Sequence, residues 1–155
     1  MNLAQLITPA QVVCRSDVNS KKKALDVLSH YLTAASPDEL DSRAVLDSLL
    51  GRERLGSTGL GQGVALPHGR LTHSTRAVGA MIKLERGIDF GAMDQQPVDL
   101  LFGLVVPEHF TDEHLKILAY LAEMFSNQAF CQSLRRLDDD QQLYQTLMSW
   151  QLSGD

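Results

Sequence analysis

The chain has 155 residues, which is the size of one ordinary domain and enough to bury a sizeable core. Hydrophobic residues make up 44% of the sequence and charged residues 21%, which excludes disordered, collagen-like and coiled-coil proteins. The formal net charge is −5 and the longest basic run is the lysine triplet at residues 21–23, which argues against nucleic acid as a partner.

The N-terminal segment, MNLAQLITPAQVVCRSD, lacks the basic and apolar regions of a signal peptide. Nowhere do about eighteen apolar residues follow one another, as a membrane-spanning helix requires. We therefore expect a cytoplasmic protein without membrane insertion. Cys14 and Cys131 lie far apart in the sequence, so two buried thiols are expected rather than a disulfide.

Two helices are predicted in the first third of the chain. Ser20 is a suitable N-cap, and the apolar positions after it follow helical spacing, namely Ala24, Leu25, Leu28, Tyr31 and Leu32. Pro37 interrupts this pattern. Helical spacing returns within residues 38–54 and predicts a second helix that ends before a glycine-rich segment.

The hydrophobic pattern then changes to one typical of strands. Residues 77–85 and 98–106 are short and rich in β-branched and apolar side chains, and residues 87–97 form a turn-rich connection. The second run is apolar at nearly every position, as in strands covered on both faces. We therefore expect residues 98–106 to form a strand near the middle of a mixed sheet with helices packed on it.

Helical spacing returns from Thr111, and two further short helices are expected over residues 127–137 and 140–150. The order of helices, strands and helices predicts an α/β fold, with a mixed β-sheet flanked by α-helices. We expect a single domain over residues 1–155, with its core from about residue 5 to about residue 150.

The segment GSTGLGQGVALPHGR, residues 56–70, combines five glycines with one histidine. Its glycines alternate and lead into a strand-like run, so they fit neither the Walker pattern nor the dinucleotide fingerprint, and no nucleotide is expected. We expect the N–H groups of residues 57–63 to face an anion. A strand over residues 64–66 would stop at Pro67, followed by a turn at His68 and Gly69.

His68 would be held at that turn, with one ring nitrogen fixed by a backbone carbonyl, and a neutral imidazole is a good nucleophile toward phosphorus. A passive histidine in a surface turn is the alternative. If Thr111 is an N-cap, His114 lies in the first helical turn on the inward face, where the helix dipole favours an anion. A satisfied core histidine would show the same spacing.

A metal site is not expected, because the spacing of the histidines does not align ligands and no cysteine or carboxylate completes a set. The histidines weighed for this purpose are His68, His73, His109 and His114. His30, His73 and His109 are expected on the surface. No nucleophile elbow surrounds Ser57, so a serine hydrolase is not expected either.

Residues 52–69 closely resemble the active-site segment of the enzyme IIA proteins of the bacterial phosphoenolpyruvate-dependent phosphotransferase system, mannitol/fructose type. The nitrogen-regulatory branch is the most similar. The resemblance continues through SKKKALDVLSHYL, RAVGAMIKLERGIDFGAMDQQPVDLLFGLVVP, HLKIL and DDDQQLYQTL in the same order. It implies a single α/β domain with a phosphorylated histidine at His68 (tele-phosphohistidine), a second active-site histidine at His114 and an active-site arginine at Arg52.

The resemblance also implies partners and a role. The phosphoryl donor would be a histidine phosphocarrier protein, charged in turn by a phosphoenolpyruvate-consuming enzyme, and no cofactor would be needed. The phosphorylated and free forms would regulate protein targets, such as sensor kinases or ion transporters. A IIA component of a fructose- or mannitol-type sugar uptake system, which passes the phosphoryl group to a IIB domain, is the alternative function.

Overall fold

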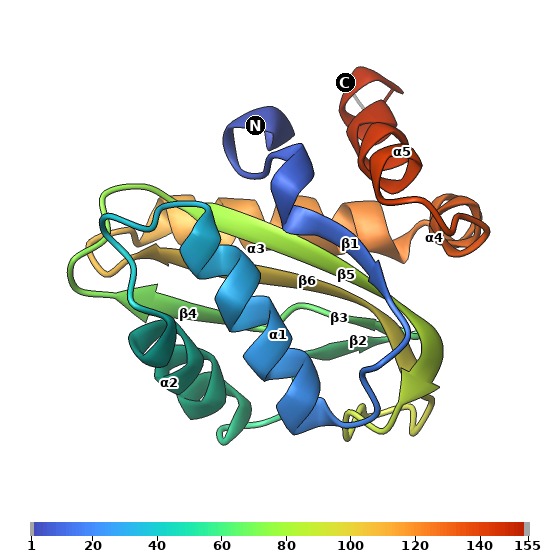
Figure 1. Ribbon diagram of the computed structural model, residues 1–155, viewed down its shortest axis with the longest axis horizontal. Helices are drawn as coiled ribbons and strands as arrows, with labels where there is room; N and C mark the ends of the chain where they lie inside the picture. The colour runs from blue at the N-terminus through green and yellow to red at the C-terminus, as the bar shows by residue number, and fades with distance from the viewer. Residues whose placement is uncertain (1, 154–155) are drawn as a thin grey trace.

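The computed structural model describes residues 2–153 and shows one mixed β-sheet with helices on both faces (Figure 1). The strands are β1 (Val12–Arg15), β2 (Gly59–Gly61), β3 (Val64–Ala65), β4 (His68–Leu71), β5 (Val78–Ile88) and β6 (Val98–Pro107). The α-helices are α1 (Lys21–Ala34), α2 (Ser42–Glu53), α3 (Asp112–Ser126), α4 (Gln128–Arg135) and α5 (Asp140–Ser153), and two short 3-10 helices precede β1 at Leu3–Gln5 and Pro9–Gln11. The predicted α/β fold with a mixed, helix-flanked sheet is confirmed.

Strand β6 lies in the middle of the sheet, as predicted. It pairs antiparallel with β5 on one side and parallel with β3 and β4 on the other. Leu101 and Val105 pack into the core beneath α1 and α2, whereas Phe102 and Leu104 pack into the core on the side of α3, α4 and α5. Because both faces are covered, nearly every position of β6 is buried, which accounts for an apolar run that only Asp99 interrupts.

The two N-terminal helices differ in how well the sequence predicts their starts. Helix α1 begins as predicted, because the Ser20 hydroxyl accepts a hydrogen bond from the N–H of Lys23 at 3.1 Å. Helix α2 begins later than predicted, since residues 37–39 form a turn and the Asp41 carboxylate caps the helix through the N–H of Ala44. Its last turn carries Arg52.

Several boundaries also differ from the prediction. Strand β5 continues to Ile88, three residues beyond the predicted end at residue 85, and the sequence does not predict β1, β2 or β4 as strands. Helices α4 and α5 lie where they are expected, although α4 is shorter and α5 is longer. Both cysteines are free thiols; Cys131 is buried as expected, whereas Cys14 is only half-buried.

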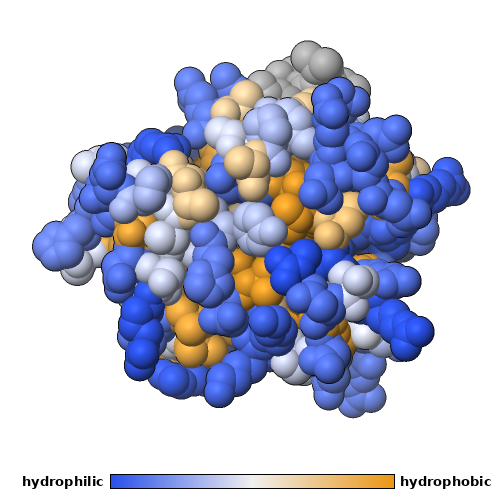
Figure 2. All heavy atoms as spheres, in the orientation of Figure 1, coloured by the Kyte–Doolittle hydropathy of each residue, from blue (hydrophilic) through white to orange (hydrophobic). Residues whose placement is uncertain are grey.

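The surface formed by α1 and α2 is largely hydrophilic, with hydrophobic residues visible only in small patches (Figure 2). None of the helices within residues 2–153 combines the length and the hydropathy that a bilayer crossing requires. The large exposed hydrophobic side chains among the described residues lie outside α1 and α2 and are Leu55, Leu60, Met93 and Leu115.

Candidate active site

His68 opens strand β4 and does not lie in a turn. Strand β3 ends at Ala65, and after a short break the chain pairs with β6 again, with His68 opposite Leu104. Pro67 has no N–H to donate, but its carbonyl oxygen accepts from the N–H of Leu104 at 2.9 Å and keeps the chain beside β6. The predicted turn at His68 and Gly69 is therefore wrong.

Gly69 is instead required by the packing of α2 against β4. A Cβ atom at this position would lie 2.0 Å from Ser48 Oγ and 3.0 Å from Ser48 Cβ. The Ser48 hydroxyl donates a hydrogen bond to the carbonyl oxygen of Arg70 at 3.0 Å, which joins the helix to the strand. The absence of a side chain at residue 69 thus brings α2 close to the strand that carries His68.

The imidazole of His68 is held by the backbone just before it, as the sequence predicts. Its Nδ1 atom lies 2.8 Å from the carbonyl oxygen of Leu66, and because a carbonyl oxygen can only accept, Nδ1 carries the ring proton. Burial lowers the pKa of His68; the charge of Arg52 acts in the same direction, while the Leu66 carbonyl and Glu53 oppose it. The neutral ring therefore presents an Nε2 lone pair, the nucleophilic form.

His114 reaches the same place from helix α3. It is the third residue of the helix and only 6% exposed, and its ring meets that of His68 edge-to-face, with centroids 5.5 Å apart and planes at 86°. Thr111 occupies the N-cap position as predicted, but its side chain makes no capping bond, because its backbone is not in the extended region that a cap requires. Burial lowers the pKa of His114, and the charges of His68 and Arg70 add to this.

Arg70 is a site residue that the sequence does not indicate. Its Nε atom donates to His114 Nδ1 at 3.2 Å. Successive side chains of a strand alternate between faces, so residues 68 and 70 of β4 share one face. Treating Pro-His-Gly as a turn hides this relationship, whereas a strand beginning at His68 would have placed Arg70 beside it.

Arg52 lies in the last turn of α2 and borders a small cavity together with His68. The cavity has a volume of about 230 Å³ and is also lined by Leu60 and Leu118. Arg52 Nη1 donates to the carbonyl oxygen of Gly56 at 2.9 Å, which ties the arginine to the glycine-rich loop. The three predicted site residues therefore lie close together. Arg52 lines the same cavity as His68, and the ring of His114 contacts the ring of His68.

A buried carboxylate beneath the glycine-rich loop is a further feature that the sequence does not indicate. Glu53 Oε1 lies 2.8 Å from Lys21 Nζ and accepts from the N–H of Thr58 at 3.2 Å, while Oε2 accepts from the Thr58 hydroxyl. Lys21 Nζ also donates to the carbonyl oxygen of Phe90 at 3.2 Å and lies over the ring of Phe90. These contacts connect α1, the end of α2 and the loop.

The expectation that the loop N–H groups face an anion fails at three positions. Thr58 N–H is bound to Glu53, Gly59 N–H donates to Ser57 Oγ at 3.1 Å, and Gln62 N–H donates to Asp94 Oδ2 at 2.8 Å. Each group is therefore satisfied within the protein. These three N–H groups are therefore not available to an anion on His68, whereas the side chains of Arg52 and His114 lie beside that ring.

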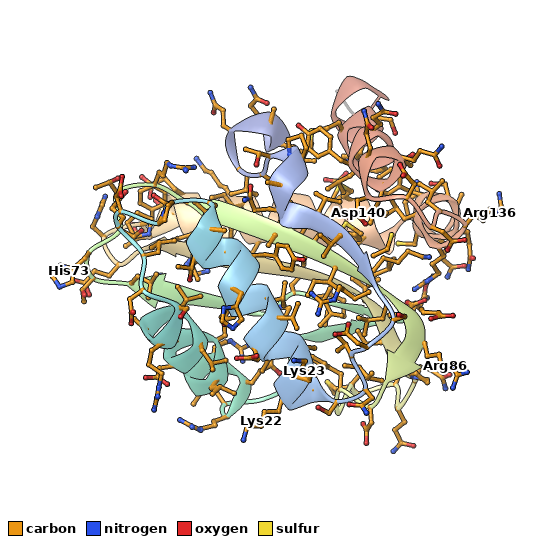
Figure 3. The ribbon with its side chains drawn as sticks, in the orientation of Figure 1. Lys22, Lys23, His73, Arg86, Arg136 and Asp140 are labelled. Atoms are coloured by element: carbon orange, nitrogen blue, oxygen red, sulfur yellow. The ribbon has the colours of Figure 1, made fainter. Side chains whose placement is uncertain are left out.

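The other histidines do not join this site. His30, His73 and His109 are exposed, as predicted. Figure 3 shows His73 at the edge of the molecule, pointing away from the ribbon. Within residues 2–153, no three histidine, cysteine or acidic side chains lie together in a way that would hold a metal ion.

Comparisons with known proteins show the family to which most of the chain is similar. Residues 5–150 match the family described as "Phosphoenolpyruvate-dependent sugar phosphotransferase system, EIIA 2". The chain is 43% identical over 146 residues to a nitrogen regulatory protein of Klebsiella oxytoca, covering 94% of this chain and 86% of that protein. It is 31% identical over 143 residues to the PTS system fructose-specific EIIA component of Haloferax volcanii, covering 91% and 92% respectively.

A solved structure agrees with the sequence comparisons. Nitrogen regulatory protein IIA-Ntr from Neisseria meningitidis matches this structure with a TM-score of 0.85 and 37% sequence identity. The match covers 94% of this chain and 98% of that one. The likeness therefore includes both the sheet and the helices that bring the two histidines together.

Proposed function

Because the chain belongs to the EIIA 2 family of the phosphoenolpyruvate-dependent sugar phosphotransferase system, we propose that it is a phosphocarrier of the nitrogen-regulatory type. His68 accepts a phosphoryl group from a histidine phosphocarrier protein, and the phosphorylated and free forms regulate other proteins. The contact between His68 Nδ1 and the Leu66 carbonyl carries the proposal, because it leaves Nε2 free to attack phosphorus. The same proposal includes a cytoplasmic location, because the phosphoenolpyruvate from which such a donor would be charged is made in the cytoplasm.

The transfer is one displacement at phosphorus. The Nε2 lone pair of His68 forms the new N–P bond while the N–P bond to the donor histidine breaks, and the electron pair of that bond returns to the donor ring. The proton on His68 Nδ1 stays in its hydrogen bond to Leu66. Since both end states are phosphohistidines, the transfer is readily reversible.

Little covalent work remains for other groups, so positioning and charge stabilisation supply the catalysis. The transferring group carries negative charge on its three outer oxygens. Arg52 borders the cavity at His68, and His114 contacts the His68 ring, so both are placed to stabilise that charge. Replacing His114 with alanine should slow transfer on the order of 100-fold, although His68 can still accept the phosphoryl group.

The surface around His68 suits a protein donor. Among the side chains that the structure describes, the exposed large hydrophobic residues are Leu55, Leu60, Met93 and Leu115, with exposed fractions of 84%, 47%, 95% and 64%. We call these four residues the apolar rim. Leu60 lines the His68 cavity, Leu115 follows His114, and Leu55 lies in the turn after Arg52. Exposed apolar groups gathered around a reactive residue are typical of a docking surface.

The fourth residue of the rim, Met93, follows a residue that contacts the glycine-rich loop. A Cβ atom at Gly59 would lie 2.9 Å from Ala92 Cβ, so the segment that carries Met93 packs directly against the loop. A sugar would need polar groups within an enclosed site, whereas this rim offers apolar contact to a second macromolecule.

The decisive experiment supplies a phosphorylated donor protein and follows the label. Wild-type protein should acquire acid-labile phosphate, as expected for a phosphohistidine, and the His68→Ala variant should acquire none. His73→Ala is the matched control, because His73 is exposed and does not line the cavity, and it should be labelled like the wild type. Label on His68→Ala would refute the assignment.

The regulatory part of the proposal depends on charge. A phosphohistidine adds up to about two negative charges, enough to change which protein surfaces the site binds. His68→Asp places a negative charge at the site and His68→Ala does not, so a pull-down with both should recover different partners, with sensor kinases and ion transporters as the first to examine. The same partners with both variants would contradict a phosphorylation-dependent switch.

Sugar uptake remains a second candidate, since the chain is similar to a fructose-specific component as well as to nitrogen regulatory proteins. The higher identity to the nitrogen regulatory proteins favours regulation. The two functions differ in the next acceptor. Phosphorylated protein mixed with a IIB domain should keep its label if it is a regulator and lose it if it serves a transporter.

A further inference from the structure

We propose that Arg70 is a positioning residue that fixes the tautomer of His114, so that His114 presents Nε2–H as a hydrogen-bond donor to the phosphoryl group on His68. The part of this inference that concerns the phosphoryl group rests on the proposed function. The part that concerns the His114 tautomer does not. The tautomer follows from the contact between Arg70 Nε and His114 Nδ1, which are 3.2 Å apart.

Only one direction is possible for that hydrogen bond. A guanidinium group has N–H donors and no acceptor, so Arg70 donates and His114 Nδ1 accepts. A neutral imidazole carries one proton, and with Nδ1 occupied as an acceptor the proton lies on Nε2. The lowered pKa of His114, caused first by burial, keeps the ring in this neutral form.

The two histidines of the site are therefore fixed in opposite tautomers. The Leu66 carbonyl holds the proton of His68 on Nδ1 and exposes a lone pair at Nε2, whereas Arg70 holds the proton of His114 on Nε2. The rings are in edge-to-face contact, with centroids 5.5 Å apart. One ring supplies a nucleophile and the other supplies a donor for the charge that accumulates beside it.

Strand β4 provides both halves of this arrangement. His68 and Arg70 are two residues apart on the strand and lie opposite Leu104 and Val106 of β6. Their side chains share one face because a strand has a period of two. Without the arginine, His114 would exchange between tautomers, and the form with an Nε2 lone pair would repel phosphoryl oxygens.

The first test measures the tautomer without any phosphoryl donor. In protein labelled with 15N-histidine, His114 of the wild type should show a protonated Nε2 and an unprotonated Nδ1. In Arg70→Met the His114 signals should move toward a mixture of tautomers, while those of His68 stay unchanged. Arg86→Met is the control, since Arg86 is exposed and lies at the far end of β5 (Figure 3). An unchanged His114 pattern in Arg70→Met would overturn the proposal.

The second test asks whether Arg70 acts through His114. Arg70→Met should slow phosphoryl transfer by about tenfold, as with partners that orient other functional imidazoles. The same substitution in a His114→Ala background should have no further effect, because the ring that Arg70 positions is gone. An additional tenfold loss in the double variant would show that Arg70 acts on the phosphoryl group directly, and would overturn a positioning role.

The two tests separate this inference from the proposed function. If no label reaches His68 but the His114 tautomer shifts in Arg70→Met, the phosphocarrier function is wrong and the tautomer assignment stands. If label reaches His68 and the tautomer does not depend on Arg70, the function stands and the role of Arg70 is refuted.

Discussion

Lys21 Nζ lies 2.8 Å from Glu53 Oε1, and this ion pair connects the first turn of α1 to the last residue of α2. The Glu53 side chain is only 4% exposed, whereas that of Lys21 is 30% exposed. The same carboxylate binds both the N–H and the hydroxyl of Thr58. The pair therefore fixes the start of the glycine-rich loop next to Arg52.

Replacing Glu53 should destabilise the fold. Glu53→Gln removes the charge that compensates Lys21 and disturbs two hydrogen bonds to Thr58, so we expect a loss of about 1–3 kcal/mol in the free energy of unfolding. Urea denaturation would measure it. Asp47→Asn is the control, because the Arg43–Asp47 pair is exposed and such pairs contribute less than about 1 kcal/mol. Equal losses in the two variants would contradict the role of Glu53.

Gly69→Ala should destabilise the contact between α2 and β4. The new methyl group would meet Ser48 Oγ at 2.0 Å, and such overpacking costs about 1–3 kcal/mol. Removing the hydroxyl with Ser48→Ala should recover part of that loss in the double variant, so the two substitutions should not be additive. Thermal or urea unfolding of the four proteins would measure the coupling, and strictly additive losses would rule out the proposed clash.

The sequence predicts the elements that have either a long hydrophobic pattern or a capping residue next to a helical apolar face. Strand β6 has ten residues with an apolar side chain at nearly every one, and α1 has a capping serine followed by a helical apolar face. Strand β1 has only four residues, and its second half is half-exposed, so neither alternation nor a continuous apolar run is long enough to identify it.

The same distinction applies to the site. The sequence predicts that a backbone carbonyl holds one ring nitrogen of His68, and the carbonyl is that of Leu66, only two residues away. The contact of Arg70 with His114 joins residues 44 apart in the sequence and depends on how α3 packs over β4. Lys21 and Glu53 likewise meet only because α1 and α2 lie side by side (Figure 1). No pattern within a short stretch of the sequence predicts these contacts.

Protonation of the two site histidines should weaken the fold at low pH. Burial is the main reason that the pKa values of His68 and His114 lie below the ordinary 6.5. In the unfolded chain both rings regain their ordinary pKa and bind protons more readily than in the folded protein. Their contribution to stability is therefore complete above about pH 6.5 and is lost as the pH falls through the folded-state pKa values.

Urea denaturation at pH 7.5 and pH 5.5 would test this. The wild type should lose stability between the two pH values, and the His68→Gln/His114→Gln variant should lose less because it lacks both titrating rings. His73→Gln should behave like the wild type, since His73 is exposed and contributes no buried ring. An identical pH dependence in all three proteins would contradict the assignment.

The apolar rim should affect docking of the donor and not the chemistry. Leu115 is 64% exposed and Met93 is 95% exposed, so replacing both with serine should leave the stability nearly unchanged. Complete burial of such a side chain contributes about 1.5–3 kcal/mol, and about 1.4 kcal/mol corresponds to a tenfold change in affinity. Even partial burial of the two side chains should therefore make the KM for the donor protein rise about tenfold in the variant, while kcat stays similar. Ala119→Ser, exposed further along α3, is the control substitution.

A small phosphoryl donor distinguishes docking from a damaged site. Phosphoramidate does not reach the rim, so it should phosphorylate His68 equally fast in the wild type and in the Leu115→Ser/Met93→Ser variant. Transfer from the protein donor alone should be impaired, because only a macromolecule covers both Met93 and Leu115 while its phosphohistidine meets His68. If the variant keeps the wild-type KM for the protein donor, the rim is not the docking surface.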